Sequence, residues 1–89
     1  MPVLLLSFEL SQKDIGSRLE IENHLGIFSS FMRIGDMIWL IETELSPGQV
    51  LNRFGEFYDS DDNVFVFRLE SDWEASASFD QLTWLENRL

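Results

Sequence analysis

Carboxylates are the side chains of this sequence with the greatest potential for chemistry, because they are numerous and clustered. Sixteen Asp and Glu residues face six Lys and Arg residues over 89 residues, which gives a net charge of -10 at pH 7. One of them, Glu9, follows an apolar run that would hold it at the end of a strand. Six more form the 59–62 cluster and the 70–74 cluster: Asp59, Asp61 and Asp62, then Glu70, Asp72 and Glu74.

Two kinds of chemistry suit these carboxylates. A carboxylate fixed at a strand end can help to bind Mg²⁺, which takes one or two carboxylates and keeps several waters. Such an ion can polarise a phosphoryl oxygen and activate a water molecule. A dense anionic surface can instead dock onto a basic protein surface, and its charges then raise the association rate and the selectivity.

A calcium loop is the third alternative, because four of the residues have nearly the right spacing. The candidate ligands are Asp59, Asp61, Asn63 and Glu70. A loop of this kind needs glycine at its sixth position, where this sequence has Val64. A solvated turn followed by a strand is therefore the predicted structure.

The basic residues argue against direct binding of nucleic acid. They occur singly along the chain, at Lys13, Arg18, Arg33, Arg53, Arg68 and Arg88. Proteins that grip phosphate backbones need clustered Lys and Arg. The three tryptophans are therefore predicted to pack in a core or an interface, and not to stack on bases.

The remaining reactive residue types give weaker signals. The one histidine, His24, falls near the end of a predicted helix, where a protonated imidazole interacts favourably with the helix dipole. The absence of cysteine excludes disulfides and thiolate zinc sites and favours an intracellular protein. The apolar run at 3–6 is too short for a signal peptide or a membrane span, so we expect a cytoplasmic protein with no membrane contact.

Secondary-structure signals show how these residues would be positioned. The apolar run at 3–10 predicts a central strand that is buried on both faces. The segment 11–14 resembles a capping box, and it predicts a helix that ends at Gly26. The next two segments, 27–34 and 37–44, predict a hairpin whose two-residue turn is Gly35-Asp36, with the glycine first.

The second half repeats the pattern. Ser46, with Pro next and Gln three residues later, predicts a second helix start. The alternating segment 63–70 predicts a fourth strand, and 78–81 predicts the start of a final helix. The chain is thus predicted to be one α+β domain over residues 1–89, a ferredoxin-like βαββαβ fold with a four-stranded antiparallel sheet plus a C-terminal helix. The two main helices would cover one sheet face, and the C-terminal segment, a partner chain or both would cover the other.

Three stretches of the sequence resemble a known family. They are Ser7-Phe8-Glu9-Leu10, the passage 39–54 from strand to helix, and the acidic loop and strand 59–69. The chain resembles, over residues 3–69, the small CRISPR-associated adaptation nucleases (the "Cas-two" family) and their VapD-like relatives. The resemblance implies a homodimer in which Glu9 meets its symmetry mate and can bind a divalent metal for phosphodiester cleavage. The family typically has Asp where this chain has Glu9, and many relatives are non-catalytic adaptors.

The resulting hypothesis is a non-enzymatic, acidic, homodimeric protein-binding module without a cofactor. Its partner would be a protein with a basic surface, which the 59–62 and 70–74 clusters would contact. The resemblance places it in a prokaryotic or phage defence, counter-defence or toxin–antitoxin setting. Two alternatives stay open: an endoribonuclease that uses paired Glu9 residues with Mg²⁺ or Mn²⁺, and a structural scaffold subunit that assembles through its aromatic sheet face.

Overall fold

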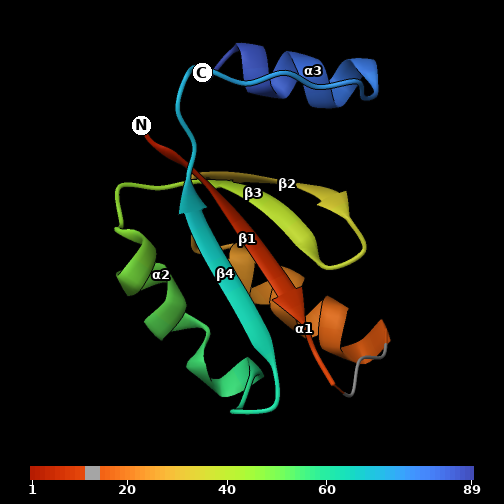
Figure 1. Ribbon diagram of the computed structural model, residues 1–89, viewed down its shortest axis with the longest axis vertical. Coiled ribbons are helices and arrows are strands. Elements are labelled where there is room, and N and C mark those ends of the chain that lie inside the picture. Colours follow the sequence, from red (N-terminus) through yellow and green to blue (C-terminus); the bar gives the residue numbers. More distant parts are fainter. Residues whose placement is uncertain (12–14) are drawn as a thin grey trace.

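The computed structural model describes residues 1–11 and 15–89, with the side chain of residue 15 left out, and confirms the predicted ferredoxin-like α+β fold (Figure 1). The predicted capping box at 11–14 falls largely outside the described residues. The elements are β1 (Val3–Glu9), α1 (Ile15–Leu25), β2 (Ser30–Gly35), β3 (Ile38–Glu42), α2 (Pro47–Arg53), the 3₁₀ turn η1 (Gly55–Phe57), β4 (Asn63–Arg68) and α3 (Phe79–Glu86).

The four strands form one antiparallel sheet in the order β2-β3-β1-β4. The first strand therefore lies in the interior of the sheet, where its apolar run is buried as predicted. Leu6 pairs with Trp39 of β3 on one side and with Val66 of β4 on the other. This order leaves β2 and β4 as the two edge strands.

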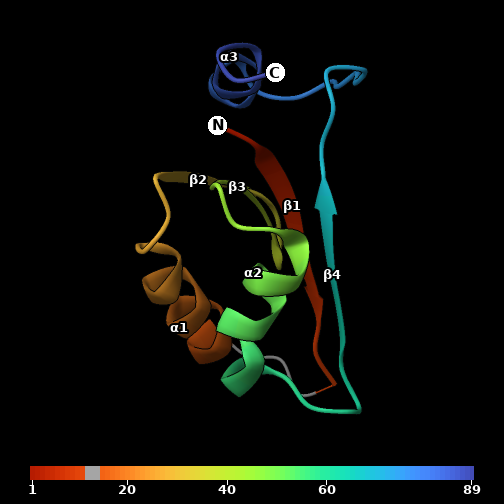
Figure 2. The same ribbon diagram turned by 90° about the vertical axis from the view of Figure 1, so that its left-hand side faces the viewer.

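Helices α1 and α2 cover one face of the sheet, which we call the inner face (Figure 2). The inner face carries the main core. Trp39 and Phe54 are its largest fully buried side chains. Phe8 meets the rings of both, edge-on, at centroid distances of 6.0 and 5.8 Å. Alternation along β4 directs Val64 and Val66 to this face, since side chains of a strand point alternately to opposite faces.

The hairpin between β2 and β3 differs from its predicted form. Gly35 is the last residue of β2, and the turn consists of Asp36 and Met37. No described glycine has a positive φ, so this is not the glycine-first turn that the sequence predicted. Met37 is 3% exposed and its carbonyl accepts a 2.9 Å hydrogen bond from Phe8, so burial of Met37 displaces the turn by one residue.

Both later helices begin at the predicted caps. Ser46 Oγ accepts a hydrogen bond from the Gln49 backbone N–H at 3.2 Å, and Gln49 Oε1 accepts one from the Ser46 backbone N–H at 2.8 Å. Ser78 and Gln81 make the same reciprocal pair at the start of α3. These capping boxes fix the starts of two short helices that packing must stabilise further.

The C-terminal helix α3 lies across β2 and β3 on the opposite, outer face of the sheet (Figure 2). Leu85 packs there with Val3 and Leu40, and Trp73 and Trp84 adjoin this second cluster. With Trp39 in the main core, all three tryptophans pack as predicted. Residues 69–78 lead from β4 to α3 across the top of the view in Figure 2, and the outer face of β4 stays uncovered.

In the part of the chain that the structure describes, no helix has the length and the apolar character to cross a bilayer.

Candidate functional site

The structure places Glu9 at the exposed end of β1, opposite Asn63 of β4. Among residues 1–11 and 15–89, no three His, Cys, Asp or Glu side chains are grouped so that they could hold a metal ion. The resemblance implies that a divalent metal at Glu9 would also take a carboxylate from a second copy of the chain.

The 59–62 cluster forms a loop that its own carboxylates hold in place. Asp62 accepts hydrogen bonds from the backbone N–H groups of Ser11, at 2.8 Å, and Asp59, at 2.9 Å. Asp59 accepts a third from the backbone of Asp61 at 2.9 Å. The donors at Ser11 and then Asp59 hold the pKa of Asp62 below its usual value, because these hydrogen bonds favour the ionised carboxylate. Asp62 is therefore a structural residue, whereas Asp59 and Asp61 present exposed charges.

The 70–74 cluster has a different construction. Glu70, Asp72 and Glu74 are exposed, whereas Trp73 between them is partly buried against the outer-face cluster. Trp73 thus attaches the segment to the sheet, and the carboxylates around it stay accessible to solvent. The 70–74 cluster is thus free of the backbone hydrogen bonds that occupy Asp62.

The structure does not bring the two clusters together within one chain. The 59–62 cluster precedes β4 and the 70–74 cluster follows it, so the six residues of β4 lie between them. An extended strand of that length spans about 20 Å. The clusters therefore bracket β4, one at each end, and do not form one continuous patch. The same separation keeps Glu70 away from Asp59, so these residues do not form a calcium loop.

Two aromatic side chains occupy the space between the clusters. Phe65 and Phe67 lie on the outer face of β4 and are 54% and 56% exposed. Their rings are stacked, with centroids 6.0 Å apart and an interplanar angle of 4°. The alternation of the sequence indicates the face on which these rings lie, but it does not reveal that α3 stops short of them.

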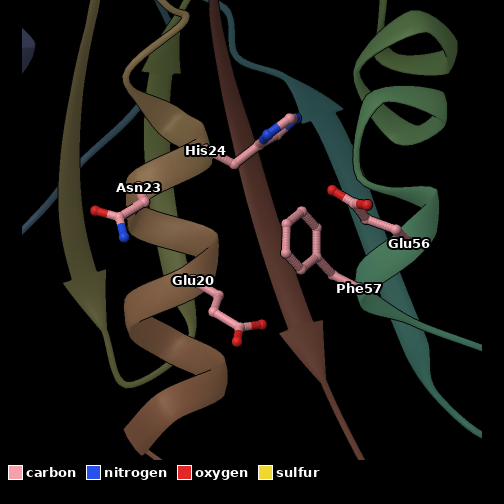
Figure 3. A pocket seen from close by; sticks show the side chains of 5 residues that line it. All are labelled: Glu20, Asn23, His24, Glu56 and Phe57. Carbon is pink, nitrogen blue, oxygen red and sulfur yellow. The ribbon is translucent and has the colours of Figure 1, made fainter.

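A second feature that the sequence did not suggest is an open groove between α1 and η1 (Figure 3). It has a volume of about 470 Å³ and is lined by Glu20, Asn23, His24, Glu56 and Phe57. The His24 ring packs against Phe54, at 4.9 Å between centroids, and against Phe57, at 5.4 Å. The lining contains no hydroxyl or thiol nucleophile, and His24 serves chiefly as an aromatic packing residue beside the core.

No protein-family model matches the chain, and no curated protein matches it significantly.

Proposed function

We propose that this protein is a non-enzymatic binding module that docks onto a basic surface of a partner protein. The observation that carries the proposal is the arrangement around β4, where the 59–62 and 70–74 clusters bracket the exposed Phe65 and Phe67. An apolar centre with a charged rim is typical of protein interfaces. The resemblance supplies the biological setting, a prokaryotic or phage defence, counter-defence or toxin–antitoxin system.

The charge of the chain sets the chemistry of the partner. A net charge of -10 repels nucleic acids and anionic membranes and attracts basic surfaces. Complementary charges mainly accelerate association and select the partner, so the complex should weaken as salt is raised. The exposed phenylalanines would supply the apolar contact, which salt does not weaken.

The test is charge reversal in the 70–74 cluster, because those carboxylates do not hold the fold together. The variant Glu70→Lys/Asp72→Lys/Glu74→Lys is compared with a control that has the same change in net charge, Glu20→Lys/Glu44→Lys/Glu86→Lys. All six positions are exposed. The probe is a decalysine peptide, and binding is measured by isothermal titration at about 0.15 M salt, where the Debye length is about 8 Å.

We expect the 70–74 variant to lose at least about tenfold in affinity, or about 1.4 kcal/mol. The control should lose less affinity, because its positions lie on α1, just after β3 and on α3, outside the two clusters that flank β4, and salt weakens the effect of more distant charges. Equal losses in both variants would show that only the net charge matters, and would reject the proposal. Binding that resists salt but disappears when Phe65 and Phe67 are replaced would favour the scaffold alternative.

Homodimerisation and the absence of catalysis are separate parts of the proposal. Sedimentation of the protein alone tests the dimer. Incubation of labelled RNA with the protein and Mg²⁺ or Mn²⁺ tests catalysis, and we expect no metal-dependent cleavage. Cleavage that Glu9→Ala abolishes without changing the oligomeric state would establish the nuclease alternative.

A further inference from the structure

We infer that β4 accepts an added β-strand from the partner: an extended segment with Lys or Arg at both ends and alternating apolar residues between them. This inference rests on the proposed function, and it adds a binding mode and a partner chemistry. Recognition by strand addition takes its affinity from main-chain hydrogen bonds and its specificity from alternate side chains.

The backbone of β4 has the free hydrogen-bonding groups that strand addition needs. Leu69 donates a 2.9 Å backbone hydrogen bond to the carbonyl of Val3. This bond shows which of the opposed residue pairs of β4 and β1 are the hydrogen-bonded ones. Hydrogen-bonded and non-hydrogen-bonded pairs alternate along an antiparallel ladder. The backbone N–H and C=O groups of Phe65 and Phe67 are therefore hydrogen-bonded to β1. Those of Val64 and Val66 point the other way, to the open edge of the sheet.

The two edges of the sheet differ in how well they are protected. Proteins usually protect an edge strand with bulges, Lys, Pro or a covering element. A helix packs on one face of each edge strand, α3 on β2 and α2 on β4, so helix packing does not distinguish the two edges. The register of β2, however, shifts between Arg33 and Gly35. Neither strand contains Lys or Pro, but the pairing of β4, with the sequence Asn-Val-Phe-Val-Phe-Arg, to β1 runs without a shift. Among the described elements, β4 is thus the edge strand with the regular geometry that pairing with another strand needs.

Charge determines which strand can occupy this edge. A strand beside β4 has its ends next to the 59–62 cluster and the 70–74 cluster, so basic residues are favoured at both ends. Its middle residues lie beside Phe65 and Phe67, where apolar side chains can pack across the strand pair. Opposite Arg68, the one cationic side chain of β4, an uncharged or acidic residue is favoured.

The same charges oppose a second copy of this chain. Antiparallel pairing of two β4 strands would place the 59–62 cluster of one copy beside the 70–74 cluster of the other. Parallel pairing would place each cluster beside its own equivalent. Either arrangement sets carboxylates against carboxylates, and like charges on paired strands are destabilising. The occupant is therefore a basic segment of a different protein, and any homodimer should leave β4 free.

The experiment uses the whole chain and a synthetic peptide, Lys-Arg-Val-Thr-Val-Thr-Val-Thr-Lys-Arg, whose six central residues match the length of β4. Amide hydrogen exchange of the ¹⁵N-labelled protein is followed by NMR with and without the peptide. Two further peptides are N-methylated at alternate central residues, one at the valines and the other at the threonines. A strand that pairs with β4 turns either its valine or its threonine N–H groups toward β4, and not both. Methylation should therefore block pairing in one peptide and not in the other, so each peptide is the control for the other.

We expect the peptide to slow exchange at Val64 and Val66, whereas Phe65 and Phe67, already bonded to β1, change little. With the peptide at ten times its dissociation constant, about one molecule in eleven is free, so exchange should slow by up to about tenfold. One methylated peptide should bind like the parent and the other should lose most of its affinity. A scrambled peptide with its basic residues in the centre should bind more weakly than the parent.

The outcomes separate this inference from the proposed function. If both methylated peptides bind like the parent, with salt dependence and without protection of Val64 and Val66, strand addition is wrong and the acidic docking surface stands. If no peptide binds, both are wrong. If Val64 and Val66 become protected at rising protein concentration without peptide, a second copy occupies the edge and the inferred partner is wrong.

Discussion

The inner and outer faces of the sheet are covered in different ways. On the inner face, two helices enclose a core in which Trp39 and Phe54 are fully buried. On the outer face, one eight-residue helix covers β2 and β3, and Phe65 and Phe67 remain more than half exposed. The inner face therefore provides most of the stability, and the outer face retains exposed apolar surface.

The outer helix compensates for its small apolar contact with polar anchors. Ser30 on β2 accepts hydrogen bonds from the Trp84 indole, at 3.0 Å, and from Arg88, at 3.3 Å. The Arg88 guanidinium lies 4.1 Å from the centre of the Trp84 ring and forms a 3.4 Å ion pair with Glu42. These contacts fix the position of α3, because each of them has a defined geometry.

The largest expected effect is on the inner face. Phe54→Ala removes a fully buried ring that packs against Phe8 and Phe28, so we expect a loss of about 3–5 kcal/mol in the free energy of unfolding. The control is Phe79→Ala, since Phe79 is 80% exposed. Replacement there should change stability by no more than about 0.5 kcal/mol. Urea unfolding of both variants measures the difference, and equal losses would contradict the division of roles between the faces.

The next largest effect is on the outer face. Leu85→Ala removes the buried side chain of α3, and we expect a loss of about 2–3 kcal/mol. The loss should be local, because α3 can detach while the inner core persists. Hydrogen exchange should therefore accelerate in α3 much more than in β1. Equal acceleration in both elements would show that the two faces unfold together.

A smaller effect is expected when the polar anchors of α3 are removed. Ser30→Ala leaves the Trp84 indole and Arg88 without their shared acceptor, at a cost of about 1–2 kcal/mol. Ser30→Thr keeps the hydroxyl and should restore most of the stability. The exchange rate of the Trp84 indole proton reports on this contact directly, and an unchanged rate in Ser30→Ala would mean that the hydroxyl does not hold the helix.

The smallest effect concerns pH and the 59–62 cluster. Because its pKa is lowered in the folded protein, the Asp62 carboxylate stabilises the fold above its unfolded pKa of about 3.9, and this contribution is lost as the pH falls through the folded value. Asp62→Asn should therefore have a lower Tm than the parent near pH 6, with the gap closing below about pH 4. Exposed Glu74→Gln is the control, and its Tm should follow that of the parent. A gap for Asp62→Asn that does not depend on pH would contradict the assignment.

Local signals in the sequence predicted most of the fold. The Ser46 and Ser78 caps and the alternation in β4 act over a few residues, and each confirmed element depends on such short-range rules. The turn between β2 and β3 was predicted one residue too early, because burial of Met37 overrides the local preference of glycine.

The candidate surface was harder to predict. Its features depend on how much of the sheet α3 covers and on how far apart the two acidic clusters lie in space. Periodicity assigns Phe65 and Phe67 to a face but cannot show where α3 ends above it. The two acidic clusters are close in sequence, and only the extended backbone of β4 separates them in space. The groove at His24 joins α1 to η1, elements that are far apart along the chain.

The position of β1 also has a consequence for the order of events during synthesis. Its pairing partners, β3 and β4, follow it in the chain, and β4 begins only at residue 63. Until then the apolar run of β1 has no strand on one of its sides, and closing a loop of this length carries a substantial entropic cost. We therefore expect slow, sheet-limited folding, with β1 as the segment of the nascent chain most open to binding by a chaperone.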